Sequence, residues 1–153
     1  MKRAAKIILY IWQLPQNIVG YFMSRAWKNC LINLTDREKV YLYGLEELTG
    51  YKIYISEYYS HKNNKVLGFI SGGSFGLYIC LNSAHDLETL KHEKGHGGQS
   101  KRTGPIYLFI IGAPSAAGNL LARKFEWFRK NYYNLPWEAW ADKLGGVKRI
   151  NQT

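Results

Sequence analysis

The sequence predicts a single α+β domain in which a short mixed or antiparallel sheet precedes a long helix and the C-terminal half is helical. Three observations support this prediction. At 153 residues, the chain has room for one domain with a core and for no second domain of ordinary size. Apolar residues make up 46% and charged residues 21%, which excludes disordered, collagen-like and coiled-coil proteins. Strand patterns lie between positions 51 and 81, and helix signals follow them.

The N-terminal segment, residues 1–26, is expected to be an amphipathic helix. Its apolar stripe either packs on the domain or lies in the plane of an anionic membrane, which residues 5–25 would bind with the help of basic residues at both ends. The segment is too polar to cross a membrane, and no small-x-small cleavage site follows, so we expect no cleavable signal peptide. The stripe has helical spacing and comprises Ile7, Ile8, Ile11, Leu14, Ile18, Val19 and Phe22.

A helix and a strand are expected next. Residues 36–49 follow a capping box that begins at Thr35, and Gly50 is a suitable helix stop, although residues 40–43 alone would also suit a strand. Residues 51–57 alternate between apolar and polar side chains, as in a half-buried strand.

Two further strands and a helix complete the predicted sheet region. Residues 66–70 and 75–81 are apolar and flank a Ser-Gly-Gly-Ser turn signal at 71–74. A second capping box at residues 83–86 then begins a helix that runs to about Ser100.

The C-terminal half is expected to consist of helices. The apolar stretch 105–121 contains Pro114, so we expect a buried core helix in two pieces, with a membrane span as the weaker alternative. Residues 123–130 suit an amphipathic helix. Residues 136–144 suit a short helix, with a proline at its first position and two glycines after it.

An H-E-x-x-H motif lies within the helix predicted from residue 83. His92 and His96 are one turn apart and about 40° from each other around the helix axis, so their ring nitrogens can meet at one metal ion. Glu93 lies beside this pair, where its carboxylate can take a proton from a metal-bound water.

A catalytic zinc needs a third protein ligand, and the acidic residues that follow the motif are Glu126, Glu138 and Asp142. Glu126 lies among basic residues and is better explained by a surface ion pair. Glu138 can bind zinc while Asp142, four residues later on the same helix face, reaches a ring N–H of a ligating histidine. Because a carboxylate near a helix C-terminus opposes the helix dipole, Asp142 is expected to have a compensating partner.

The motifs together resemble a zincin-like metallopeptidase family of the minimal gluzincin type, which includes small uncharacterised bacterial proteins and the C-terminal domains of some Rhs-repeat proteins. The resemblance rests on His-Glu-Lys-Gly-His at 92–96, Gly-Pro-Ile-Tyr-Leu at 104–108, Gly-Ala-Pro-Ser at 112–115 and Glu-Ala-Trp-Ala-Asp at 138–142, and it covers residues 50–147.

This resemblance implies a Zn²⁺ ion held by His92, His96 and Glu138, with Glu93 as the general base and Asp142 behind the ligands. It also implies a peptide or protein substrate, which such enzymes bind along the strand before the helix. Gly97-Gly98 departs from the family, in which bulkier residues are common, so we expect close backbone packing or a loosened helix end there.

A peptidase also needs a hydrogen-bond donor for the oxyanion that develops on the substrate. The sequence offers Tyr107, Tyr132, Tyr133 and His85 for this role and does not choose between them.

The net charge of +10 suits anionic partners and supports an alternative function, a non-enzymatic basic protein on a zincin-like fold that binds a membrane surface or nucleic acid. Nucleic acid is not the expected partner, because the basic residues are spread over the chain without a recognition motif. The expected location is the bacterial cytoplasm or the membrane surface. Cys30 and Cys80 lack any paired spacing and are predicted to be buried free thiols.

Overall fold

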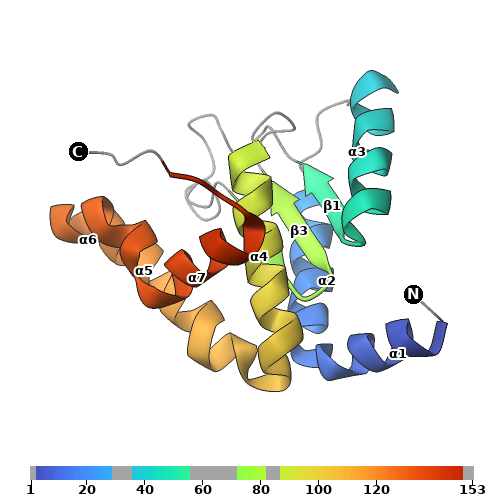
Figure 1. The fold of residues 1–153 in the computed structure, drawn as a ribbon, viewed down its shortest axis with the longest axis horizontal. Coiled ribbons are helices and arrows are strands. Elements are labelled where there is room, and N and C mark those ends of the chain that lie inside the picture. The colour runs from blue at the N-terminus through green and yellow to red at the C-terminus, as the bar shows by residue number, and fades with distance from the viewer. Residues whose placement is uncertain (1–2, 29–35, 56–71, 82–86, 150–153) are drawn as a thin grey trace.

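The computed structural model describes residues 3–28, 36–55, 72–81 and 87–149, and it confirms the α+β class (Figure 1). Within these residues, seven α-helices accompany one three-stranded sheet, and the C-terminal half is helical as expected.

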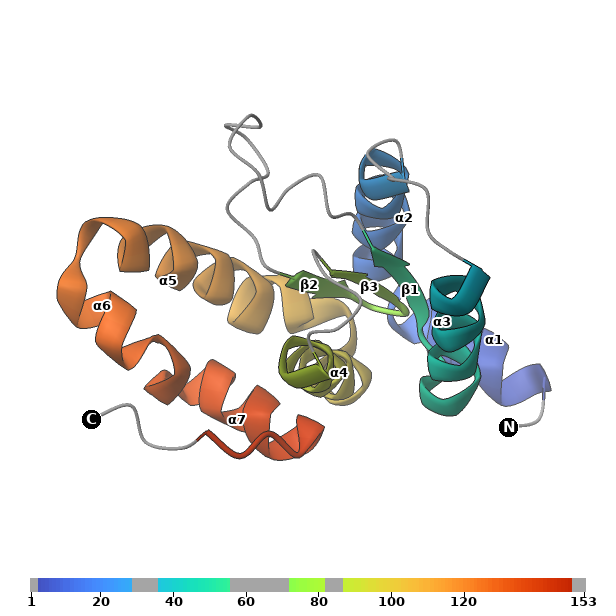
Figure 2. The ribbon, with the colours of Figure 1, turned by 90° about the horizontal axis from the view of Figure 1, so that it is seen from above.

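The sheet is small and mixed. Its strands are β1 (Lys52–Ile55), β2 (Gly72–Phe75) and β3 (Tyr78–Leu81), in the order β1-β3-β2. β3 pairs in parallel with β1 and antiparallel with β2. The helices α2 (Leu14–Lys28) and α4 (Leu87–Thr103) cover opposite faces of this sheet (Figure 2). The apolar core under α4 comprises Tyr51, Ile53, Ile55, Ile79, Leu81 and Leu90.

The glycine turn predicted at 71–74 is wrong. Gly72 and Gly73 belong to β2, and the turn lies at Gly76, whose φ of 63° suits a glycine. Gly72 serves a close approach instead, because a Cβ there would lie 2.8 Å from Cγ2 of Thr89 on α4. The strand expected at 66–70 and the capping box at 83–86 lie outside the described residues. The capping box that begins at Thr35 depends on side chains that are not described either.

The N-terminal segment forms two helices rather than one. α1 (Arg3–Trp12) and α2 are separated at Gln13, and none of the residues of α1 is buried. α2 packs on the domain through Gln16, Asn17, Gly20 and Ser24, while the apolar stripe is largely exposed. The expectation that the apolar stripe packs on the domain is therefore wrong, since the polar side does so.

Residues 36–49 are helical, which decides against the strand alternative. The helix α3 (Asp36–Thr49) lies beside β1, and the chain continues directly from it into the sheet. Cys80 is buried in β3 as a free thiol, as predicted, and burial raises its pKa to about 12, with a smaller effect from Glu93. Cys30 lies outside the described residues.

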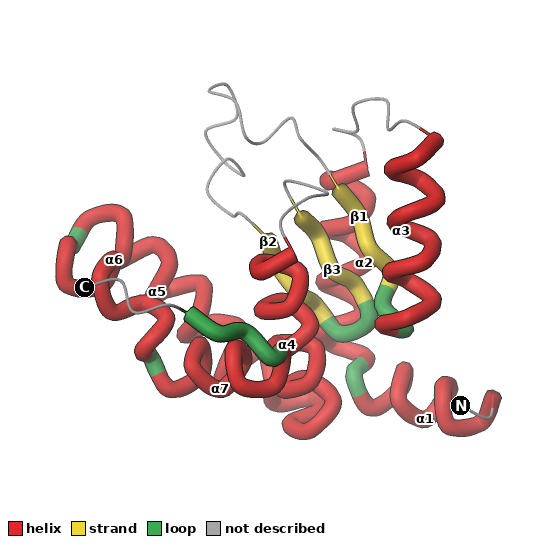
Figure 3. The backbone as a smooth tube through the Cα atoms, turned by 45° about the horizontal axis from the view of Figure 1, so that its top comes forward, coloured by secondary structure: helices red, strands yellow, loops and turns green. Residues whose placement is uncertain are grey.

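The helices that follow α4 differ in part from the prediction (Figure 3). The stretch 105–121 is not the expected buried core helix, because Tyr107, Ile111 and Gly118 are its buried residues and the others are half-buried or exposed. Pro114 lies in the first turn of its helix, where a missing N–H costs nothing. Phe125 is extended and interrupts the helix expected at 123–130. The elements are a 3₁₀-turn (Gly104–Ile106), a π-helix (Leu108–Gly112), α5 (Ala113–Lys124), α6 (Glu126–Asn131), a 3₁₀-turn (Tyr132–Asn134) and α7 (Pro136–Gly145).

No helix in the described part of the chain is both long and apolar enough to cross a membrane. The membrane-span alternative for residues 105–121 is thus not supported by the helices seen there.

Candidate metal centre

The site is built where α7 crosses α4 at very short distance. A Cβ on Gly95 of α4 would collide with the carbonyl group of Ala141, and a Cβ on Gly145 of α7 would collide with the carbonyl group of Lys91. The two glycines therefore let the backbones touch. This contact brings the face of α4 that carries His92 and His96 against the face of α7 that carries Glu138 and Asp142.

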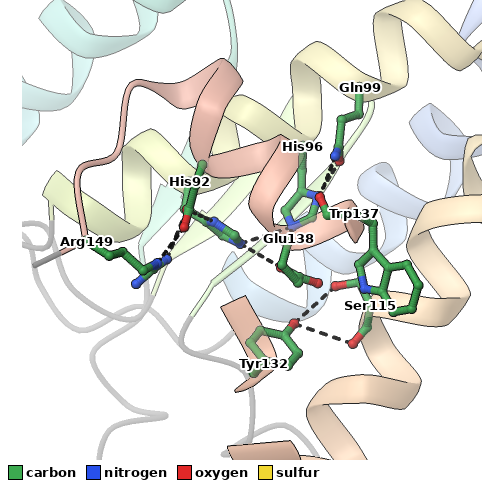
Figure 4. A network of polar contacts seen from close by, with 9 residues as sticks. His92, His96, Gln99, Ser115, Tyr132, Trp137, Glu138 and Arg149 are labelled. Carbon is green, nitrogen blue, oxygen red and sulfur yellow. Dashed lines mark hydrogen bonds and ion pairs between the residues drawn. The ribbon is translucent and has the colours of Figure 1, made fainter. Parts of the chain in front are cut away.

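Three side-chain atoms converge at the crossing. Nε2 of His92 lies 3.1 Å from Nε2 of His96, and Oε2 of Glu138 lies 3.0 Å from the first and 3.3 Å from the second of these nitrogens. All three side chains are buried, and Figure 4 shows His92 and His96 directed toward Glu138. The structure thus brings together the three residues that the sequence proposed as metal ligands.

The opposite nitrogen of each imidazole ring has an acceptor as its partner. Nδ1 of His92 lies 2.6 Å from Oδ1 of Asp142, and Nδ1 of His96 lies 2.7 Å from Oε1 of Gln99. The orientation of the Gln99 amide is fixed, because its Nε2 donates to the carbonyl oxygen of Trp137 at 2.6 Å. Both Nδ1 atoms therefore donate, and in the neutral rings both Nε2 atoms are left as acceptors.

Two nitrogen lone pairs and a carboxylate oxygen consequently face one another, an arrangement that a cation between them would stabilise. In addition, Oε1 of Glu138 is buried and has no hydrogen-bond partner among the described residues. The cluster of His92, His96 and Glu138 could hold a metal ion.

The electrostatics of the cluster also favour a positive charge. Burial alone lowers the pKa of His92, but the hydrogen bond to Glu138 and the charge of Glu93 outweigh it and raise this pKa to about 9. The pKa of His96 is raised by the same two carboxylates against the effect of its burial. Burial raises the pKa of Glu138, yet the two histidines hold it well below its usual value. A cation at Nε2, either a proton or a metal ion, satisfies these carboxylates.

Asp142 has the compensating partner that its position at the end of a helix demands. Nε of Arg149 donates to Oδ2 of Asp142 at 2.6 Å, and Nη2 donates to Oδ1 at 3.1 Å. The Arg149 guanidinium also lies 3.2 Å from the ring centre of Tyr133, and the Tyr133 ring is nearly perpendicular to the ring of His92, with 5.5 Å between their centres. Asp142 thereby holds His92 through Nδ1 while Arg149 and Tyr133 hold Asp142 and the ring in place.

Glu93 lies beside the cluster on α4 and is not one of its three converging residues. Its side chain is buried and lines a cleft of about 280 Å³, which His92 and His96 also line. Burial raises the pKa of Glu93, the two histidine charges oppose this, and Glu138 adds to it. A carboxylate with a raised pKa is a stronger base than an ordinary glutamate.

The cleft lies between β2 and the helices of the C-terminal half. Tyr107, Tyr132 and Tyr133, three of the four predicted oxyanion donors, line it, and His85 lies outside the described residues. The hydroxyl groups of Tyr132 and Ser115 are 3.2 Å apart, and dashed lines join these two residues in Figure 4. Among the described residues, β2 pairs with β3 alone, so its outer edge is open on the side of the cleft.

Gly97 confirms the expectation of close backbone packing. A Cβ at this position would lie 2.5 Å from the ring of Tyr51, and α4 continues as a helix to Thr103. Gly97 therefore makes room for the core, whereas a Cβ on Gly98 would meet only ordinary contacts, and the end of the helix is not loosened.

Sequence reasoning missed two residues of the site. Gln99 stands three positions after His96, so helical spacing could have indicated it as a partner of that ring. Arg149 follows α7 after the chain has turned at Gly146, and no sequence pattern announces its return to Asp142.

Comparisons with known proteins give no relative. No family model matches the chain, and neither a curated protein nor a solved structure is significantly similar to it. The resemblance to zincin-like peptidases therefore stays a prediction, and inferences about function depend on the geometry of the site.

Proposed function

We propose that the protein is a zinc-dependent metallopeptidase of the zincin-like type, with His92, His96 and Glu138 as zinc ligands and Glu93 as the general base. The convergence of three acceptor atoms at the edge of a cleft carries this proposal. Two imidazoles and one carboxylate are a donor set of catalytic zinc sites, which keep a fourth position for water or substrate.

The spacing of the acceptors supports zinc. In a tetrahedron with metal–ligand distances of about 2.0–2.1 Å, two ligand atoms are roughly 3.3 Å apart. The separations here lie between 3.0 and 3.3 Å. Zinc bound there would lower the pKa of a water molecule and polarise the carbonyl group to be attacked.

The side chains around the cluster have separate tasks in this mechanism. Glu93 accepts the proton of the attacking water and delivers it to the leaving nitrogen. Asp142 and Gln99 fix both imidazole rings with Nε2 directed at the cluster. The open edge of β2 supplies backbone groups with which an extended peptide can pair, and this pairing favours no particular side-chain sequence.

Exchange of the base tests the proposal. Glu93→Gln preserves the shape of the side chain but removes its basicity, so peptide hydrolysis should fall roughly 10²–10⁴-fold while zinc content stays at the parent level. The measurement is hydrolysis of a fluorogenic peptide library by zinc-loaded parent and variant, with zinc determined by mass spectrometry. Glu126→Gln, an exposed carboxylate on α6 that is not among the residues lining the cleft, is the control and should match the parent.

Equal hydrolysis by the parent and Glu93→Gln would contradict the proposed base. A parent that binds zinc and cleaves no library peptide would favour the alternative of a non-enzymatic protein that keeps this fold for binding.

A further inference from the structure

The N-terminal helices present their apolar side away from the domain. The inward side of this region is polar and is fastened to α4 by hydrogen bonds. Gln16 donates to the carbonyl oxygen of Gly104 at 2.5 Å and to the hydroxyl of Ser100 at 3.2 Å, and Ser100 donates to Gln13 at 2.8 Å. Asn17 accepts from the backbone N–H of Leu77 at 2.9 Å. These contacts hold the helices without use of the exposed apolar residues Ile7, Ile8 and Ile11.

A second exposed apolar segment adjoins α1. The ring of Trp12, at the end of α1, lies against Gly104, and its indole N–H donates to the carbonyl oxygen of Lys101 at 3.1 Å. Directly after Gly104 the chain exposes further large apolar side chains, with Phe109 78% exposed. Figures 1 and 3 show α1 and the end of α4 at the same edge of the molecule. We call this combined surface the apolar rim, which comprises Ile7, Ile8, Ile11, Ile106, Phe109 and Ile110.

The two segments that carry the apolar rim contain charged residues of a single sign. Residues 3–28 contain no Asp or Glu, and neither do residues 94–125, although both segments contain several Lys and Arg. All eleven acidic residues lie outside these two segments. An apolar surface set in purely basic segments is complementary to anionic lipid, whose headgroups attract Lys and Arg while the acyl boundary accepts the apolar side chains.

We propose that the apolar rim docks the protein on an anionic lipid bilayer, with α1 in the plane of the interface. No described helix is able to span the bilayer, so binding is peripheral. The proposal does not depend on the proposed peptidase activity. It does place the cleft near the lipid, because Tyr107 and Gly112 line the cleft on the same segment that exposes Phe109 and Ile110.

Vesicle co-sedimentation tests this proposal. The full chain should bind vesicles of phosphatidylglycerol and phosphatidylcholine, should bind pure phosphatidylcholine at least tenfold more weakly, and should lose affinity as salt rises. Replacing two rim residues together, Ile8→Ser with Phe109→Ser, should lower the partition constant by about 100-fold. The control is Leu48→Ser on α3, an apolar residue 83% exposed outside the rim, which should bind as the parent does.

A second pair of variants tests the charges. Lys6→Gln on α1 should weaken vesicle binding about fivefold, whereas Lys143→Gln on α7 should not change it. Chelation of metal should leave the binding of every variant unchanged, which separates this proposal from the peptidase proposal.

Three outcomes would overturn the docking proposal. They are equal recovery of the parent in the supernatant with and without vesicles, undiminished binding by the folded Ile8→Ser/Phe109→Ser variant, and a dimer of the parent in light scattering that the double variant abolishes without any vesicle binding.

Discussion

Two clusters of buried polar side chains meet α4 on different sides, and they differ in how well their hydrogen-bonding groups are paired. Toward α2, Gln13, Gln16, Asn17 and Ser100 pair donors with acceptors, and of their side-chain atoms Oε1 of Gln16 alone is buried without a partner. Toward α7, three acceptors converge with no donor between them when both imidazole rings are neutral and donate through Nδ1.

This difference indicates that the cluster toward α2 attaches the N-terminal helices and that the cluster toward α7 is a binding site. Paired neutral groups in the first cluster leave no demand for a ligand, and they specify how the N-terminal helices are attached. In the second cluster the unpaired acceptors, one of them charged, demand a cation. Substitutions in the first cluster should therefore change stability, and substitutions in the second should change metal affinity.

The largest effect on metal affinity is expected for Glu138→Gln. The exchange removes the negative charge from the three converging acceptors, so zinc affinity should fall by more than the roughly 100-fold that loss of a supporting partner produces. Competition with a chromogenic chelator measures this affinity. Glu126→Gln, which breaks an exposed ion pair with Lys130 on α6, is the control and should not change it.

A smaller loss is expected for Asp142→Asn. An amide is a weaker acceptor for Nδ1–H of His92 and no longer attracts Arg149, so zinc affinity or hydrolysis should fall roughly 10–100-fold. The chelator competition and the peptide assay measure the two quantities. If neither zinc affinity nor hydrolysis changed, Asp142 would serve only to bind Arg149 near the C-terminus.

Gln16→Leu is expected to leave the metal affinity unchanged and to lower the stability of the fold. The carbonyl oxygen of Gly104 keeps the backbone N–H of Tyr107 as a donor but loses the Gln16 amide, which also donates to Ser100. The free energy of unfolding should therefore decrease by about 0.5–1.5 kcal/mol. Urea unfolding of the metal-free protein measures this decrease. The matched substitution Gln99→Leu on α4 should lower both the free energy of unfolding and the zinc affinity, because His96 loses the acceptor that orients its ring. Equal zinc affinities for the two variants would remove the distinction between the clusters.

Helices and site residues were predicted from the sequence because their signals are local. The spacing of His92, His96, Glu138 and Asp142 places each pair on one helix face, and Pro136 marks the start of α7. That the two faces meet depends on the close crossing of α4 and α7 at Gly95, a contact between segments far apart in sequence. The sequence does contain a sign of this contact, Gly95 inside the H-E-x-x-H motif. A glycine in a helix does not by itself show which other helix packs against it, so the crossing could not be predicted.

The errors arose where composition was used as a measure of burial. The apolar residues of α1 and of 105–121 were expected to pack on protein, yet Ile8, Phe109 and their neighbours are exposed while Gln13 and Gln16 are buried. The sequence does not state which side of a helix faces the domain when the inward side is polar. In the sheet, the residue type of Gly72 and Gly73 indicated a turn, but both lie in β2. At Gly72 the lack of a side chain lets α4 pass close to the strand.

The central claim is that His92, His96 and Glu138 together hold one zinc ion, and the most direct measurement is the zinc content of the purified chain before and after chelation and reloading. The account predicts about one zinc per chain in the parent, loss on chelation, recovery on reloading, and no zinc above background in the folded double variant His92→Ala/His96→Ala. Zinc at parent level in that variant, or a parent that takes up none, would contradict the claim.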